Sequence, residues 1–339
     1  MLGRLTASYR NPQFNTMNLL ILSPGRRVEI VEYFKNEFHK DNRQVFTLDM
    51  SLMAPALYSG DKYFIVKKDF NNLQTYISDI INIALDNNVT SILSLIDPEL
   101  VLLAENRELF LREGITPIVS RSQFICATFN KFEFYNLYKN LIPLVPTYSE
   151  YNDIINRLKN KELSYPIFAK LRNGSASIGI KKIESSNDFE SIKGNLDYIY
   201  QPYIDGIEYG VDAYFDMLTG ELVSVFIKRK ITMRAGETDK AVSVKSDLIL
   251  DVIKQISKIN GVYGPIDIDI FVDKNNTVYI NEINPRFGGG HPHAHGCGVN
   301  FMALILNNLK GFSNIPSFND YEDNILMLKY NGILLRKYE

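Results

Sequence analysis

Two kinds of hydrophobic pattern divide the chain, and the first covers residues 17–122. Short apolar runs typical of buried strands lie at 18–23, 45–49, 91–96 and 115–119. Between them, apolar residues recur every three or four positions, which predicts helices at 28–38, 73–85 and 99–112. Strands that alternate with helices form parallel, doubly wound sheets, so we expect an α/β domain here.

After residue 122 the predicted strands alternate apolar and polar residues, so that each strand buries one face. We expect such strands at 165–172, 180–183, 198–202, 208–212, 223–233, 265–272 and 278–284. The polar stretch 234–240 and the histidine-containing stretch 291–297 are both expected to be loops. Asn300 should cap a helix that ends at Gly311, and residues 312–339 should add a final strand or two.

Composition narrows the class of protein without identifying a chemistry. A chain of 339 residues with 45% hydrophobic and 22% charged residues is typical of a soluble globular protein with two or three domains. Its net charge of −2 gives no electrostatic reason to expect nucleic acid as a partner. No apolar run approaches membrane-spanning length, so we expect no membrane association.

The cysteines bear on the cellular compartment, and residues 1–16 bear on where the first domain begins. Cys126 and Cys297 have neither a metal-binding spacing nor enough partners for a disulfide framework, which favours a reducing cytoplasm. Residues 1–16 lack the apolar core of a signal peptide, and Met17 begins the first clear strand. We therefore expect residues 1–16 to be a short extension.

The strand at 278–284 carries the strongest candidate chemistry and runs into Pro285, Arg286 and three glycines. Alternation places Glu282 and Asn284 on one face, with Arg286 just beyond. Carboxylate and amide oxygens suit Mg²⁺, and arginine binds phosphate oxygens through paired hydrogen bonds. The pattern indicates a site for a polyphosphate that carries Mg²⁺.

The preceding strand supplies a second acid through a hairpin with a turn at 273–276. Asp267 and Asp269 share one face, and either could lie beside Glu282. The alternative is a surface hairpin with its polar residues in solvent. The regular apolar alternation argues against it, because it would leave these acids unassisted on a buried sheet.

A small-residue loop at 173–179 follows the strand that contains Lys170. Small side chains leave backbone N–H groups free to approach phosphate oxygens, and Lys170 adds a positive charge. The loop is not a Walker P-loop, because it lacks the Gly-Lys-Ser/Thr run and a strand follows it. Taken alone, it could equally be a flexible hairpin tip.

The basic pair Arg26-Arg27 follows the first strand, and Asp97 follows the strand at 91–96. Ligands of doubly wound sheets bind beyond the carboxyl ends of the strands, so these residues should face a cleft. A dinucleotide site is excluded because the turn at Gly25 has one glycine instead of three. Whether the two arginines bind substrate or are simply solvated stays open.

Together these segments resemble the ATP-grasp enzymes. Asp269, Glu282, Asn284 and Arg286 fill a pattern similar to their magnesium-binding signature, and residues 201–209 resemble their hinge. The resemblance covers about residues 124–309, with a helix lysine, strand lysine, glycine loop, hinge and metal triad in the family's order. Within the family, the chain looks most like single-module relatives of the carbamoyl phosphate synthetase large subunit. One module cannot supply that enzyme's two modules, so we do not predict carbamoyl phosphate synthesis.

The resemblance implies an architecture of successive units. Residues 17–122 would be the Rossmann-like pre-ATP-grasp domain with a doubly wound parallel sheet. Residues 123–310 would be a two-lobed α+β ATP-grasp domain whose lid lobe spans about 140–205, and 311–339 would be a C-terminal segment.

The resemblance also implies roles for individual residues. Those expected to bind ATP are Lys131, Lys170, Gly174, Ser175, Ser177, Gly179, Gln201, Tyr203, Ile204 and Glu208. Asp269, Glu282 and Asn284 would bind Mg²⁺ (or Mn²⁺), and Arg286 would contact the transferred phosphate. Many relatives have an acid where Pro202 stands, so hinge contacts from that side chain are absent here.

Four residues are weaker candidates. Lys228 and Arg234 would face the cleft as phosphate or substrate contacts, or be solvated edge charges. His291 and His293 would line the acceptor site. The histidine spacing also suggests zinc, but a glycine-flanked loop with no nearby further ligand does not fix a tetrahedral site.

The expected activity is an ATP-dependent ligation of a small-molecule carboxylate to an amine through an acylphosphate. Two alternatives are phosphoryl transfer of the kinase or carboxylase type and a regulator that binds ATP without turnover. The intact Asp269, Glu282, Asn284 and Arg286 argue against the regulator. The identity of both substrates and the choice between monomer and homodimer stay open.

Overall fold

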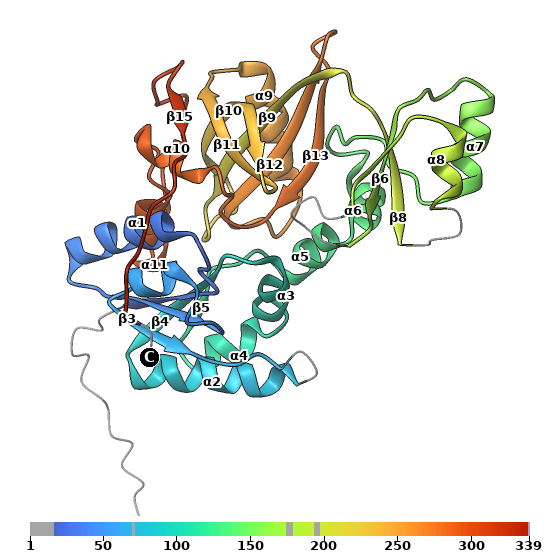
Figure 1. The fold of residues 1–339 in the computed structure, drawn as a ribbon. Helices are drawn as coiled ribbons and strands as arrows, with labels where there is room; N and C mark the ends of the chain where they lie inside the picture. The colour runs from blue at the N-terminus through green and yellow to red at the C-terminus, as the bar shows by residue number, and fades with distance from the viewer. Residues whose placement is uncertain (1–16, 70–71, 174–178, 193–196, 338–339) are drawn as a thin grey trace, which may run out of the picture.

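The computed structural model describes residues 17–69, 72–173, 179–192 and 197–337, which form three sheets with surrounding helices (Figure 1). The first sheet is all parallel, in the order β3-β2-β1-β4-β5. Its strands are β1 (Asn18–Leu22), β2 (Val45–Asp49), β3 (Lys62–Ile65), β4 (Val89–Ser94) and β5 (Thr116–Pro117). Its helical segments are α1 (Val28–Phe38), η1 (His39–Asp41), η2 (Pro55–Ser59), α2 (Leu73–Asp86), α3 (Asp97–Glu105) and α4 (Arg107–Arg112). The predicted parallel α/β fold is confirmed.

Two details of this sheet differ from the sequence expectation. Strand β3 has largely exposed side chains, so it lacks the apolar signal by which buried strands are found. The single helix expected at 99–112 is two helices separated at Asn106, whose side-chain amide donates to the carbonyl of Leu102 at 2.9 Å. An asparagine that bonds the backbone locally competes with helix continuation.

The second sheet is seven-stranded and mostly antiparallel, with the order β13-β12-β9-β10-β11-β15 and β14 parallel to β10. Its strands are β9 (Gly206–Phe215), β10 (Leu222–Arg234), β11 (Glu237–Ser243), β12 (Gly264–Asp273), β13 (Val278–Asn284), β14 (Ser317–Phe318) and β15 (Leu326–Leu328). The prediction of a loop at 234–240 was wrong. Ala235 and Gly236 alone make the turn, both with positive φ, and β11 begins directly afterwards.

The third sheet is small, with the antiparallel order β7-β6-β8. It consists of β6 (Ile167–Leu171), β7 (Lys181–Ile183) and β8 (Tyr198–Pro202). Figure 1 shows α7 (Tyr151–Lys159) and α8 (Ser186–Glu190) beside it, where Ile154 and Phe189 join the core of this lobe. The predicted two-lobed arrangement that follows the parallel domain is confirmed.

The remaining helical segments cover the two faces of the seven-stranded sheet. They are α5 (Ser122–Phe129), α6 (Lys131–Tyr138), α9 (Asp247–Gln255), η3 (Ile256–Lys258), α10 (His291–Gly296) and α11 (Phe301–Leu309). Phe124, Phe134 and Ile253 pack on one face, from α5, α6 and α9. The stretch 291–297 was expected to be a loop, but His291–Gly296 form the helix α10. Pro292 in its first turn suits a helix start, where the missing N–H costs no hydrogen bond.

One core joins the parallel domain to the seven-stranded sheet. Phe34 of α1 lies with Phe226 of β10, Phe287 and Phe301 in a single buried cluster. This shared core fixes the loop after β1 against the end of β13. Among the described residues, no helix is long and apolar enough to cross a membrane.

Candidate functional site

A cleft of about 820 Å³ lies where the three sheets meet, and its volume suits a small-molecule ligand. Residues from the parallel domain, the small lobe and the hairpin of β12 and β13 all line it. The candidate residues that it brings together are Arg26, Arg27, Lys131, Lys170, Gln201, Tyr203, Ile204, Glu208, Asp269, Glu282, Asn284 and Arg286.

The register of β12 and β13 decides which acid lies beside Glu282. Asp269 is directly opposite Glu282, and Asp267 is opposite Asn284. Cross-strand neighbours in an antiparallel pair have Cβ atoms about 5 Å apart, so the two facing carboxylates can share one cation.

A β-bulge adds Asn281, which simple alternation places on the opposite face from Glu282. The register shifts between Asp269 and Ile270, and Ile270 then pairs with Ile280 instead of Asn281. A bulge re-aims side chains locally. Consequently both Asn281 and Glu282 line the cleft.

Two lysines from different elements converge on this hairpin. Lys170 of β6 donates from Nζ to Oδ1 of Asn281 at 2.8 Å. Lys131, at the first position of α6, places Nζ 3.2 Å from Oε1 of Glu282. Burial lowers the pKa of Lys170, although the charge of Glu282 acts in the opposite direction.

Lys230 of β10 is a third cleft lysine, which our sequence analysis did not select. Its Nζ lies 2.7 Å from Oε1 of Glu208 and 2.5 Å from Oδ1 of Asp269. Burial alone would lower the pKa of Lys230, but these two carboxylates outweigh it and raise the pKa. Gly210 leaves room for this lysine, because a Cβ there would lie 3.3 Å from its Cε.

Arg286 joins the end of β13 to the parallel domain. Its Nε donates to Oδ1 of Asp97 at 2.8 Å, where α3 begins. Asp267 is its second acidic neighbour, at 3.9 Å. Burial, together with Asp269 and Asp212, raises the pKa of Asp267 to about 6.

The two arginines after β1 have different surroundings. Arg27 donates from one terminal nitrogen to the carbonyls of Leu95 and Phe287, at 3.1 and 2.9 Å, and lies 4.0 Å from Glu237. It therefore holds the two domains together. Burial and the neighbouring Arg286 lower the pKa of Arg27. Arg26 also lines the cleft, in the exposed turn after β1.

The three glycines after Phe287 lie so close to charged side chains that a Cβ at any of them would require those side chains to shift. A Cβ on Gly288 would lie 2.3 Å from Cγ of Asp267, and one on Gly289 would lie 2.7 Å from Cδ of Glu237. A Cβ on Gly290 would lie 2.7 Å from Cε of Lys228. The glycine run thus allows the backbone to close over these charges.

Lys228 does not line the cleft. It is buried beneath Gly290, and its ammonium group contacts the carboxylate of Asp212. His291 is buried on the other side of that carboxylate, with Nδ1 at 3.3 Å. Burial favours the neutral acid, but Lys228 and His291 outweigh it and lower the pKa of Asp212 to about 2.

The other expected site residues are also outside the cleft lining. Nε2 of His293 lies 2.9 Å from the carbonyl of Ile325, and Arg234 is exposed and paired with Asp239 at 2.7 Å. Gly179 has a φ of +74° and packs on Leu171. Gly174, Ser175 and Ser177 lie outside the described residues.

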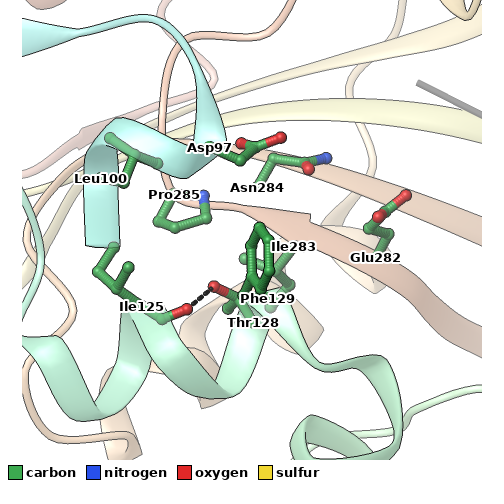
Figure 2. A pocket seen from close by; sticks show the side chains of 9 residues that line it. All are labelled: Asp97, Leu100, Ile125, Thr128, Phe129, Glu282, Ile283, Asn284 and Pro285. Carbon is green, nitrogen blue, oxygen red and sulfur yellow. Dashed lines mark hydrogen bonds between the residues drawn. The ribbon is translucent and has the colours of Figure 1, made fainter. Parts of the chain in front are cut away.

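A small pocket of about 20 Å³ adjoins the cleft beside β13, and Asp97, Glu282 and Asn284 line both (Figure 2). It is bounded by Phe129, Pro285 and Ile125, and Thr128 donates to the carbonyl of Ile125 at 2.8 Å. The volume is about that of one water molecule, so the pocket cannot hold a substrate. Of these two neighbouring pockets, only the cleft is large enough for a substrate.

The donor set in the cleft fits Mg²⁺ better than zinc. Among the residues that the structure describes, no three His, Cys, Asp or Glu side chains are grouped to hold a metal. Asp269, Glu282 and Asn284 offer two carboxylates and an amide. Mg²⁺ is commonly bound by one or two carboxylates together with substrate phosphates.

Comparisons with known proteins match the two main regions of the chain. Residues 19–118 match the family described as "PylC-like, N-terminal domain", and residues 128–290 match the family described as "ATP-grasp domain". The D-alanine–D-alanine ligase of Geobacillus thermodenitrificans is 29% identical over 38% of this chain and 40% of its own length. The vancomycin/teicoplanin A-type resistance protein VanA of Enterococcus faecium is 22% identical over 36% of this chain and 42% of its own. The chain thus spans about two fifths of the length of these curated relatives.

Solved structures match over a larger part of the chain, and at their low identity they establish the fold. N5-carboxyaminoimidazole synthetase of Staphylococcus aureus has a TM-score of 0.69 at 18% identity, covering 89% of this chain and 79% of its own. The biotin carboxylase domain of the Hydrogenobacter thermophilus 2-oxoglutarate carboxylase has a TM-score of 0.72 at 17% identity, covering 91% and 73%.

Proposed function

This chain is an ATP-grasp protein with a PylC-like N-terminal domain, and from that premise we propose that it ligates a carboxylate to an amine with ATP. One observation carries the proposal. The facing carboxylates of Asp269 and Glu282 share a cleft wall with Lys170, and Arg286 lies at the same strand end. Metal-binding oxygens beside phosphate-binding cations suit phosphoryl transfer.

In the proposed nucleotide site, Lys131 and Lys170 bind the phosphates. Bound Mg²⁺ neutralises phosphate charge, and Asp269, Glu282 and Asn284 would hold it. Lys230 now occupies the position between Asp269 and Glu208. It substitutes for the cation's charge and must shift when these acids bind metal and ribose.

The adenosine end lies beside β8 in this proposal. Gln201, Tyr203 and Ile204 line the adenine, and Glu208 accepts hydrogen bonds from the ribose. The side-chain amide of Gln201 donates to Oγ1 of Thr147 at 3.0 Å, which fixes its orientation. Gly174, Ser175, Ser177 and Gly179 belong to the loop proposed to cover the phosphates.

The proposed reaction has two steps. A substrate carboxylate oxygen attacks the γ-phosphorus, the bond to the β-phosphate oxygen breaks, and ADP leaves as an acylphosphate forms. The amine nitrogen then attacks the acyl carbon, phosphate leaves with the former carboxylate oxygen, and the nitrogen loses a proton. Arg286 stabilises the transferred phosphoryl group in both steps. The protein supplies positioning and charge and needs no covalent nucleophile.

The acceptor end is proposed to lie between the loop after β1 and the glycine run. Arg26 faces this end and is the candidate for an anionic group of the substrate, whereas Arg27 fixes the loop. Lys228, His291 and His293 would support this wall from behind, and Arg234 would hold the turn between β10 and β11 through Asp239, because none of the four lines the cleft.

A second candidate is carboxylation through carboxyphosphate. It is favoured by the fold neighbours, which include carboxyaminoimidazole synthetases and a biotin carboxylase domain solved with MgADP and bicarbonate. Both candidates release ADP, so ADP release alone does not separate them.

The test is a screen of carboxylate–amine pairs, and of bicarbonate–amine pairs, for ADP release and product mass. Ligation is supported by a product equal to the two substrates minus water, and carboxylation by a gain of CO₂. Lys170→Ala serves as the control and should weaken both ATP binding and turnover, since it removes a charge needed in ground and transition states. ATP binding unchanged by Lys170→Ala would contradict the nucleotide site, and no ADP release with any pair would contradict the enzyme.

A further inference from the structure

The end of the chain carries a hairpin sequence that is open in this structure. Residues 325–330 are mostly apolar, 333–335 are apolar and are followed by Arg336 and Lys337, and Asn331-Gly332 lies between the two segments. Asn-Gly between two such runs is the strongest short-range signal for a two-residue β-turn. The sequence therefore predicts that 333–337 should pair with the strand before the turn.

Only the first strand of that hairpin is formed. β15 pairs antiparallel with β11, and the structure assigns no strand to residues 329–337. Instead the chain continues away from β15 and passes the parallel domain (Figure 1). There the guanidinium of Arg336 lies 4.1 Å from the ring centroid of Tyr58. Among the described strands, β15 thus has a pairing partner on one edge only.

Both halves of the open hairpin expose large apolar side chains. Leu326 and Leu328 of β15 are 52% and 58% exposed, and Ile333 and Leu335 of the arm are each 88% exposed. A two-residue turn would place Tyr330 opposite Ile333 and Leu328 opposite Leu335. The exposed residues of the strand and of the arm are therefore the ones that this register would bring together.

We propose that residues 333–337 of one chain pair with the free edge of β15 in a second copy of this chain, and that the exchange is reciprocal. The arm already extends away from its own β15, so the hairpin register can be completed between chains. Exchange of identical elements gives a closed two-fold dimer and uses the same contacts as the closed hairpin.

The strand exchange would also affect the cleft, through Lys329, the residue that follows β15. Nζ of Lys329 lies 3.3 Å from Oε2 of Glu237, which lines the cleft, and its backbone N–H donates to the carbonyl of Asp239 at 3.1 Å. A paired arm would hold Lys329 and Glu237 more firmly in place.

The test is disulfide trapping in the full-length chain with Cys126→Ser and Cys297→Ser, carrying Leu328→Cys together with Leu335→Cys. Reciprocal exchange predicts a disulfide-linked dimer on a non-reducing gel. A monomer with both thiols consumed would show that the hairpin closes within one chain, and free thiols would show that the arm does not pair. Either result overturns the proposal. Leu328→Cys with Leu334→Cys is the matched control, because residue 334 faces the other side of the strand.

Light scattering on the unmodified chain gives an independent reading. We expect a dimer whose dissociation constant rises at least tenfold, by about 1.4 kcal/mol or more, when Ile333→Lys and Leu335→Lys are introduced. Tyr58→Ala removes the contact with Arg336, together with the contacts of Tyr58 to Leu52 and Tyr63, all within one chain, and should leave the dimer unchanged. A parent chain that is monomeric at all concentrations, or a dimer insensitive to the arm changes, would contradict the exchange.

Discussion

The wall of the cleft and the core beneath it both hold a lysine against carboxylates, with opposite consequences. Lys230 lies between Glu208 and Asp269, which line an open cleft. Lys228, two residues earlier on the same strand, lies with Asp212 and His291 where water has no access. Charges in the cleft can be exchanged for ligand charges, whereas those in the core have only each other. The same pair of residue types can thus serve binding in one place and structure in the other.

Breaking the buried pair should give the largest effect. Lys228→Met keeps the length of the side chain but leaves Asp212 as a buried charge with only His291 as partner. Removing one member of a buried pair typically costs about 3–5 kcal/mol in the free energy of unfolding. Urea unfolding measures this loss.

The matched variant is Lys230→Met, which leaves its carboxylates in contact with solvent. We expect it to lose much less stability than Lys228→Met. Equal losses for the two variants would abolish the distinction between cleft and core.

Removing a cleft charge should have the reverse signature, with a large effect on rate and little on stability. Under the proposed function, Glu282→Gln keeps the shape but weakens neutralisation of the transferred phosphate, so the rate should fall about 10²–10³-fold. The variant should melt close to the parent without ligand, because relief of the repulsion from the facing Asp269 offsets loss of the ion pair with Lys131. It should also lose most of the thermal shift that Mg·ATP gives the parent. Normal turnover, or unfolding without ligand, would remove the carboxylate pair from the chemistry.

The core should also respond to acid through His293. Burial and the charge of Lys228 lower the pKa of His293 to about 4, from 6.5. Between these values the unfolded chain binds more protons than the folded one, so stability is full above pH 6.5 and is lost as pH falls toward 4. The shift corresponds to a loss on the order of 3 kcal/mol.

Urea midpoints between pH 4.5 and 7.5 measure this dependence. His293→Gln should remove only part of it, because burial also lowers the pKa of His295, on the same helix, to about 4. A slope that is the same in His293→Gln and the parent would show that another group controls the acid response.

The smallest effect should separate the two arginines of the loop after β1. Arg26→Ala should raise KM for the carboxylate substrate several-fold and leave KM for ATP and the melting temperature unchanged. Arg27→Ala removes hydrogen bonds to the carbonyls of Leu95 and Phe287, so it should lower the melting temperature as well. If both variants behave alike, the loop is either all binding surface or all scaffold.

Sequence patterns located most of the elements and the face on which the candidate residues lie, because alternation and helical periodicity report burial directly. They missed Asn281 because a bulge breaks the alternation, and bulges follow from cross-strand register. They could not distinguish Lys228 from Lys230, because both lie on one face of β10. Only the tertiary structure shows that Lys228 is the covered one. They missed β11 because it begins with polar residues, of which Thr238 and Asp239 are buried side by side, and Asp239 is paired with Arg234.

The run Gly288 to Gly290 determines where the substrate range of this protein could be changed by engineering. A side chain at Gly288 or Gly290 would displace Asp267 or Lys228, which are held by other charges, so libraries that vary these positions should yield mostly destabilised protein. Arg26, Ile96 and Thr238 line the same cleft with side chains of their own. Variation aimed at accepting a larger or differently charged acceptor is therefore best placed at these three positions, with the glycines left intact.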